Sequence, residues 1–194
     1  VDQLTKKLNL KTNQSNLGIA HTRWATHGIP SEKNAHPHQS KNIFVVHNGI
    51  IENHKDLRAY LKAEGIRFST QTDTEVIGHL IRTFTEKGQS FEKAVFNSIK
   101  KLKGAYALGI IDNKNPEQII GVRNQSPLVL GKGFQENFIA SDVMALAPVT
   151  NKFTYLDDGQ IALLTNQKAV VKNISNKIVR TKTYEVDSNA YTND

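Results

Sequence analysis

The sequence has no cysteine among its 194 residues, which excludes a disulfide framework and a zinc site built on cysteine. It also lacks an apolar run long enough to cross a bilayer and a charged-then-apolar signal at its start, so we expect no membrane partner. It has no low-complexity run, and its 38% hydrophobic and 22% charged residues are typical of a globular protein. We therefore expect a cytoplasmic protein with one main domain.

The net charge of +7 comes from lysines that are scattered along the chain. A basic surface attracts phosphate-bearing partners. A nucleic-acid face would also need stacking aromatic residues or a known binding motif, and the sequence shows neither. We interpret the charge as a solvated surface and expect no nucleic-acid partner.

The first part of the chain predicts two strands separated by a loop. Residues 17–24 alternate as a strand does, and Gly28, Pro30 and Pro37 predict a loop over 25–42. β-Branched and aromatic residues at 43–46 predict a buried strand, and the pair Asn48-Gly49 predicts a turn directly after it.

Three helices are predicted next, from apolar residues at helical spacing. Their expected starts are Asn53, Thr72 and Ser90, and glycines end them at 65, 88 and 104. Thr72 and Glu75 have the spacing of a capping box for the second helix. We expect neighbouring helices of this set to cover one face of a sheet.

From residue 105 the pattern changes to that of strands separated by Asn, Gly and Pro turns. The predicted strands are 106–111, 118–122, 128–130, 138–140, 153–156, 160–164, 169–171 and 178–186, with a short helix at 143–147. Strands, then consecutive helices, then many strands exclude a doubly wound βαβ fold. The order predicts an α+β fold with helices packed on antiparallel sheets.

Polar residues with catalytic or binding chemistry gather early in the chain, where six of the seven histidines lie between positions 21 and 54. One interpretation is a metal site, whose candidate ligands are His27, His36, His38 and His47. The proline between His36 and His38 does not match the helical histidine pair of common zinc hydrolases, and we expect no metal.

A second interpretation is structural. Arg23 and Trp24 would pack under a loop, and the backbone would satisfy His47. Asn48 and Gly49 would then serve only as a turn.

A third interpretation is a site for an anion and a developing oxyanion. Arg23 can bind a carboxylate through a bidentate fork. The Asn48 amide and the Gly49 backbone N–H can both donate to one negative oxygen, and glycine has no Cβ to block close approach. Asp73 either caps the second helix or binds a substrate ammonium group. Together these groups fit acyl transfer from an amino-acid amide, for which glutamine is the obvious candidate.

Six motifs strengthen this third interpretation, and they occupy, in order, residues 23–28, 34–38, 47–53, 72–77, 104–107 and 136–142. Together they resemble the glutaminase domain of glucosamine-6-phosphate synthase, also called glutamine–fructose-6-phosphate aminotransferase (isomerising). The resemblance extends from Gly18 to about Val186. Amidophosphoribosyltransferase-like and asparagine-synthetase-like glutaminases share the fold and the Asn-Gly pair, and they stay as alternatives.

The resemblance implies an N-terminal-nucleophile hydrolase fold, with antiparallel sheets sandwiched between helical layers. The glutaminase domain would cover residues 1–187, and 188–194 would begin an interdomain linker. No cofactor is implied. The substrate would be glutamine, the ammonia would pass to fructose-6-phosphate on an absent isomerase domain, and the parent protein would be a homodimer.

The resemblance also implies a role for each site residue. Asn48 and Gly49 would form the oxyanion hole. The substrate-binding residues would be Arg23 for the α-carboxylate of glutamine, Asp73 for its α-ammonium, Thr26 and His27 on a loop that closes over it, and Trp24 as a gate for ammonia.

The chain departs from this family at the nucleophile. The family uses an N-terminal cysteine that its own α-amino group activates, and this chain contains no cysteine and begins with valine. We expect that an upstream segment with that cysteine and the first strand is missing, and that the chain is inactive alone. The alternative is a catalytically dead module that binds glutamine or docks on a partner.

Overall fold

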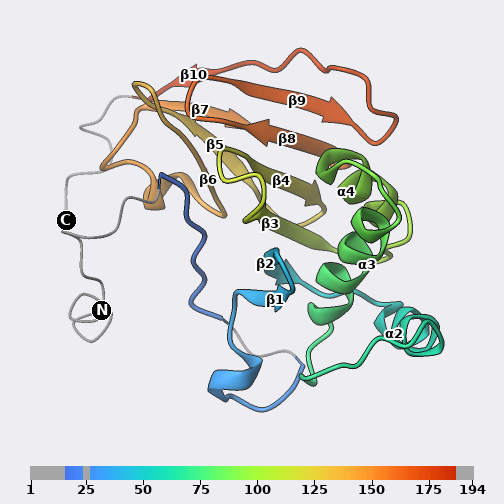
Figure 1. Ribbon diagram of the computed structural model, residues 1–194. Coiled ribbons are helices and arrows are strands. Elements are labelled where there is room, and N and C mark those ends of the chain that lie inside the picture. The colour runs from blue at the N-terminus through green and yellow to red at the C-terminus, as the bar shows by residue number, and fades with distance from the viewer. Residues whose placement is uncertain (1–15, 24–26, 187–194) are drawn as a thin grey trace.

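The computed structural model describes residues 16–23 and 27–186 (Figure 1). Over these residues the chain forms three α-helices, which are α2 (His54–Ala63), α3 (Glu75–Glu86) and α4 (Phe91–Ile99). Two short 3₁₀ helices, η1 (Glu32–Asn34) and η2 (Val143–Ala145), lie in connecting segments. No helix in the described ranges has the length and apolar character needed to cross a membrane.

The strands form two antiparallel sheets. The larger sheet has the order β1-β2-β3-β4-β8-β9 and contains β1 (His38–Ser40), β2 (Ile43–Gly49), β3 (Tyr106–Asp112), β4 (Ile119–Asn124), β8 (Gln160–Leu164) and β9 (Ala169–Asn173). The smaller sheet has the order β10-β7-β5-β6 and contains β5 (Val129–Lys132), β6 (Asn137–Ala140), β7 (Lys152–Tyr155) and β10 (Tyr184–Glu185).

The larger sheet is covered on both faces (Figure 1). Apolar residues of α2, α3 and α4 form one core with Ile43 and Val45 of β2 and with inward residues of β3, β4 and β8. A second core joins the other face to the smaller sheet, for example through Ala162 and Leu130. Strands buried on both faces read as continuous apolar runs. This explains why β3 and β8 lack the alternation of a half-exposed strand.

The structure confirms the α+β fold with antiparallel sheets and helices on one sheet face. Each strand predicted between 106–111 and 169–171 forms within two residues of its expected ends. On the outer face of the smaller sheet, the segment around η2 packs through Leu146 against Val129 and Phe153. The helix expected at 143–147 is the short 3₁₀ helix η2, and it lies in a segment that covers the outer face of the smaller sheet.

The strand predicted at 17–24 is wrong over its described part, because residues 17–23 form no strand in the structure. The alternation itself is real, since Leu17, Ile19, His21 and Arg23 are half-buried and the residues between them are exposed. This segment crosses a sheet face: a Cβ placed on Gly109 of β3 would lie 3.8 Å from Ile19 Cγ2. Burial against a face gives the same alternation as strand pairing does.

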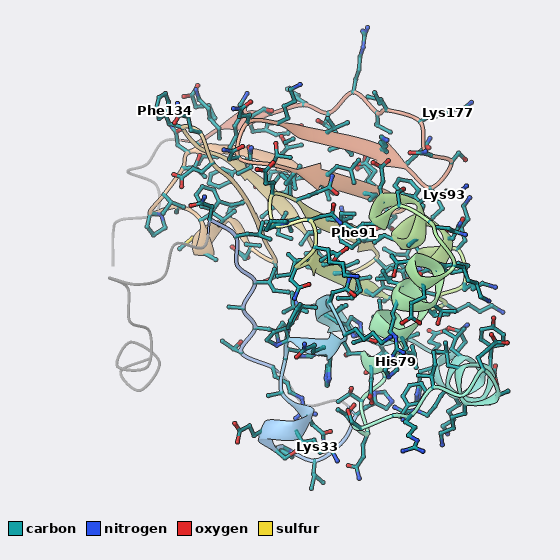
Figure 2. All side chains as sticks on the ribbon, in the orientation of Figure 1. Lys33, His79, Phe91, Lys93, Phe134 and Lys177 are labelled. Atoms are coloured by element: carbon teal, nitrogen blue, oxygen red, sulfur yellow. The ribbon has the colours of Figure 1, made fainter. Side chains whose placement is uncertain are left out.

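The loop predicted at 25–42 is also partly wrong, because it contains β1. The inward residues of β1 are polar, so no apolar pattern marked the strand. Their polar atoms are satisfied by hydrogen bonds, from Ser40 Oγ to His79 Nδ1 at 2.8 Å and between His38 Nε2 and Thr72 Oγ1 at 3.0 Å. Figure 2 shows His79 on α3, the helix that lies beside this strand.

Two predicted helix starts use different chemistry from the one expected. The capping box at Thr72 is wrong: α3 begins at Glu75, whose carboxylate accepts hydrogen bonds from the backbone N–H groups of Ser69 and Thr70 at 2.7 and 2.8 Å. Asn53 is the N-cap of α2 by position, but its Nδ2 donates to the Lys101 carbonyl at 2.9 Å. The side chains of Glu75 and Asn53 thus form hydrogen bonds to neighbouring loops and do not cap the helices at whose starts they lie.

Three further predictions fail in part. Asn48 and Gly49 are the last residues of β2 and face Ala107 and Tyr106 of β3, so they are not a turn. The third helix ends at Ile99, short of Gly104. Of the strand predicted at 178–186, only Tyr184 and Glu185 form a strand, β10.

Candidate active site

A cavity of about 250 Å³ opens where the end of β2 and the start of α3 meet the segment 21–23 and His27. This volume lies just below the ~300–1,000 Å³ that is usual for pockets of drug-sized ligands, so the cavity suits a small metabolite. The residues that line it are His21, Arg23, His27, His36, His47, Asn48, Gly49, Ile50, Thr72, Asp73 and Thr74.

The end of β2 presents Asn48 and Gly49 to this cavity. The backbone N–H of Ile50 donates to the Ala105 carbonyl at 2.8 Å, so in an antiparallel ladder the N–H of Gly49 points away from β3. β1 lies on that side of β2, but its pairing ends at Val45. The Gly49 N–H therefore points past the end of β1, at the strand end that borders the cavity.

Gly49 also occupies a position that only glycine fits. Its φ is +116°, a backbone conformation that side chains strongly disfavour. A Cβ here would overlap the carbonyl oxygen of Ala105 and lie 2.9 Å from Tyr106 Cα. Close contact with β3 therefore fixes both the identity of this residue and the direction of its N–H.

Asp73 lies just before α3 and is 3% exposed. Its Oδ2 accepts a hydrogen bond from the Ile51 backbone N–H at 2.8 Å, which ties the start of α3 to the residues after β2. Its Oδ1 lies 3.9 Å from His27 Nδ1. Oδ2 of the carboxylate is thus used in a hydrogen bond to the backbone, whereas Oδ1 lies on the side of His27, another residue of the cavity wall.

Arg23 reaches the cavity wall from a backbone with φ of +52°. Its Nη2 donates to the carbonyl oxygens of His27 and Gly28 at 2.8 and 3.0 Å, and its Nη1 donates to that of Ile29 at 3.3 Å. In this structure the guanidinium holds the 27–29 loop. A carboxylate would have to use its remaining N–H groups or displace the loop carbonyls.

Histidines surround the Thr74 hydroxyl, which lies 3.1 Å from His36 Nε2 and 3.0 Å from His47 Nδ1. Burial and the neighbouring histidines together lower the pKa of His36 from 6.5 to about 3. Burial also lowers the pKa of His47 to about 4, with Asp73 opposing the shift and neighbouring histidines adding to it. Burial also lowers the pKa of His38. These three rings are neutral at pH 7, so His36 and His47 add hydrogen-bonding groups to the cavity wall without adding positive charge.

The candidate metal ligands do not come together as a metal site in the described residues, where no group of three or more His, Cys, Asp or Glu side chains is arranged to hold a metal. Two of the histidines instead share the Thr74 hydroxyl. His38 pairs with Thr72.

The buried histidines predict a loss of stability in mild acid. Because the folded-state pKa values of His36 and His47 lie below 6.5, the unfolded chain takes up protons first as the pH falls. Stability should therefore drop between pH 6.5 and about 4, by up to ~1.4 kcal/mol per pH unit for each histidine. Urea unfolding at several pH values measures this slope.

A variant identifies the source of this slope. His47→Asn keeps an amide near the Nδ1 position and removes one titrating ring, so its slope should fall by about one proton. An unchanged slope in the variant would contradict the assignment to His47.

Glu75 affects stability in a lower pH range. Burial would raise the pKa of its carboxyl group, but hydrogen bonds from His79, Ser69 and Thr70 outweigh that effect and lower the pKa. The stability that the ionised Glu75 contributes is therefore lost only below about pH 4.5.

Five of the predicted site residues line one cavity, namely Arg23, His27, Asn48, Gly49 and Asp73. Trp24 and Thr26 lie outside the described residues. The sequence interpretation missed Thr74, and it gave His21 no role. The sequence does contain one indication for His21. It lies two residues before Arg23 in an alternating segment, and residues at that spacing point to the same side of an extended chain.

Comparison with known proteins gives a family for this chain. The model of the family described as "Glutamine amidotransferase domain" matches residues 21–148. The chain is 50% identical over 190 residues to glutamine–fructose-6-phosphate aminotransferase [isomerizing] of Buchnera aphidicola, covering 97% of this chain and 31% of that protein. It is 51% identical over 173 residues to the protein of the same name from Escherichia coli K12, covering 89% of this chain and 28% of the relative. The chain thus spans less than a third of the length of these relatives.

The fold has matches among solved structures. Glutamine phosphoribosylpyrophosphate amidotransferase from B. subtilis, solved with ADP and GMP, superimposes with a TM-score of 0.67 at 26% identity, over 81% of this chain and 35% of that one. Its fold is that of the N-terminal-nucleophile amidotransferases. From the family match, the identity to relatives and this shared fold, we conclude that the chain belongs to the glutamine amidotransferase domain family.

Proposed function

We propose that this chain is the glutaminase part of a glutamine–fructose-6-phosphate aminotransferase. Glutamine would be hydrolysed to glutamate and ammonia, and the ammonia would aminate fructose-6-phosphate to glucosamine-6-phosphate. Identity of 50% across 97% of the chain supports this choice over a phosphoribosylpyrophosphate amidotransferase, to which the identity is 26%. The observation that carries the proposal is the meeting of Asn48, Gly49 and Asp73 in one small cavity.

The geometry suggests how glutamine would lie. Its α-ammonium would bind Asp73 through Oδ1, the oxygen that Ile51 does not use. Its α-carboxylate would bind Arg23. The carbonyl oxygen of the side-chain amide would then face Asn48 and the Gly49 N–H, which would stabilise the oxyanion of the tetrahedral intermediate. Removal of one such donor typically costs about 10²–10³ in kcat.

We propose residues 1–187 as the glutaminase domain and 188–194 as the start of a linker to a sugar-binding part. Four further points stay predictions. They are a homodimeric parent protein, a cytoplasmic location, the role of Trp24 as a gate for ammonia, and the roles of Thr26 and His27 on a loop that closes over glutamine. The cysteine that attacks the amide would come from another part of the parent protein, since these 194 residues contain none.

The isolated chain should release no glutamate from glutamine. It offers donors for the oxyanion, but without a thiol nucleophile the tetrahedral intermediate does not form. A coupled glutamate dehydrogenase assay of the purified chain, against a buffer blank, measures this. Glutamate release above the blank would show a nucleophile other than cysteine in the chain.

The complete gene product tests the function itself. It should release glutamate from glutamine and form glucosamine-6-phosphate when fructose-6-phosphate is added. The absence of cysteine favours one other candidate, a module that binds glutamine without turnover. A complete gene product that binds glutamine in calorimetry and releases no glutamate would establish that second function and exclude the first.

A further inference from the structure

The side-chain amide of Asn48 can stabilise an oxyanion in only one of its two orientations. With Nδ2 toward the substrate it donates a hydrogen bond to the developing charge. With Oδ1 toward the substrate it repels that charge. An asparagine at this place therefore needs a neighbour that distinguishes its oxygen from its nitrogen.

His21 is that neighbour. Its Nε2 lies 2.6 Å from Asn48 Oδ1. Its Nδ1 accepts a hydrogen bond from the backbone N–H of Arg23 at 2.8 Å. A backbone N–H can only donate, so Nδ1 carries a lone pair and the proton of the neutral ring sits on Nε2. Nε2–H then donates, and the Asn48 atom that faces it has to be the oxygen.

Two features of the surroundings hold the His21 ring in place. Arg23 has a left-handed backbone, with φ of +52°, and its N–H donates to His21 Nδ1. On another side, His36 packs edge-on against His21 with ring centroids 4.4 Å apart. Burial keeps His36 neutral at pH 7 by lowering its pKa to about 3, so it places no positive charge against the ring.

We propose that His21 is a positioning residue of the glutaminase site, which fixes the Asn48 amide with Nδ2 turned toward the substrate. The chain of contacts runs from the Arg23 backbone through the His21 ring to the amide. His21 acts through Asn48 and needs no contact with glutamine of its own. This inference rests on the proposed oxyanion role of Asn48.

The kinetic test uses the complete gene product and measures glutamine hydrolysis. In His21→Phe, which keeps a ring but removes the donor, kcat should fall about tenfold to hundredfold, toward the loss seen when an oxyanion-hole donor is removed. KM for glutamine should change less than about threefold, because the donor acts mainly on the transition state. His21→Gln, whose Nε2 can reach the same oxygen, should recover most of kcat.

Thr22→Ala is the matched control, because Thr22 is the exposed neighbour of His21 and is not part of the cavity wall. It should keep the kcat and KM of the unaltered protein. An unchanged kcat in His21→Phe would overturn the proposal. An equal loss in His21→Phe and His21→Gln, together with a lowered melting temperature in both, would also overturn it, since that result indicates a packing role.

A second measurement needs no activity and uses the 194-residue chain. Long-range ¹⁵N–¹H NMR should show His21 as the Nε2–H tautomer, and the Asn48 side-chain amide signals should shift in His21→Phe but not in Thr22→Ala. The Nδ1–H tautomer would overturn the proposal. If the complete protein shows no glutaminase activity, the proposed function fails, and the NMR result still decides whether His21 orients Asn48.

Discussion

Asp73→Asn is expected to weaken glutamine binding by about tenfold to hundredfold. A hydrogen bond to a charged group is worth about 1.5–3 kcal/mol, which corresponds to this range of Kd. The Asp73 side chain is 4% exposed, so water does little to screen its attraction for the α-ammonium of the substrate. Isothermal titration of glutamine into the 194-residue chain, before and after the substitution, measures the loss.

Replacing Asp73 with asparagine separates the effect on glutamine binding from the effect on the stability of the fold. An asparagine Oδ1 can still accept the hydrogen bond that Ile51 donates to Asp73 at 2.8 Å, so the melting temperature should change little. Asp56→Asn makes the same charge change at an exposed site in the first turn of α2 and should leave Kd unaltered. Equal affinities in the unaltered chain and Asp73→Asn would show that the ammonium binds elsewhere.

The elements that the sequence predicts well are those whose burial is apolar. Local composition is enough to predict Ile43 and Val45 of β2 as buried strand residues and the continuous apolar runs of β3 and β8 as strands. Helix starts are recognised where the cap is local, as at Ser90, whose side chain accepts from the Lys93 N–H at 3.4 Å. In these cases the interaction that decides the structure lies within a few residues.

The elements that the sequence misses depend on partners far along the chain. β1 is a strand because α3 satisfies the buried Ser40 through His79, and no local pattern contains that information. The segment 17–23 alternates because it crosses a sheet face, and alternation does not distinguish this from pairing. The sequence makes Asn48 a candidate because few residue types can donate to an oxyanion. It gives His21 no role, because its contact with Asn48 joins residues that are 27 positions apart.

The Asn48-Gly49 pair shows the same limit within the site. Both residues are common in turns because both tolerate positive φ, and only Gly49 uses that freedom here. The backbone of Ala105 and Tyr106, which lies against Gly49, decides that β2 continues through the pair. The structure places the pair in the wall of the cavity, as the last residues of β2, and the turn predicted for it is wrong.

Gly49→Ala should destabilise the fold by at least about 3 kcal/mol, because it adds a steric overlap to a strained backbone conformation. The new Cβ would overlap the Ala105 carbonyl oxygen, which already accepts the Ile50 N–H at 2.8 Å, so neither strand can move without breaking the ladder. Gly65→Ala is the matched control: φ is +80° there and no atom lies within 4 Å of the new Cβ. Urea midpoints of both variants measure the two costs.

The difference between the two variants isolates the contact with β3. Gly65→Ala carries only the conformational strain, about 1–2 kcal/mol for a residue in the left-handed region. If Gly49→Ala costs no more than that, the strand end can move aside and the direction of the Gly49 N–H is not fixed by packing. If Gly49→Ala costs substantially more, the close contact with Ala105 that excludes a side chain at position 49 also fixes the backbone there. The direction of the Gly49 N–H is then fixed before any substrate binds.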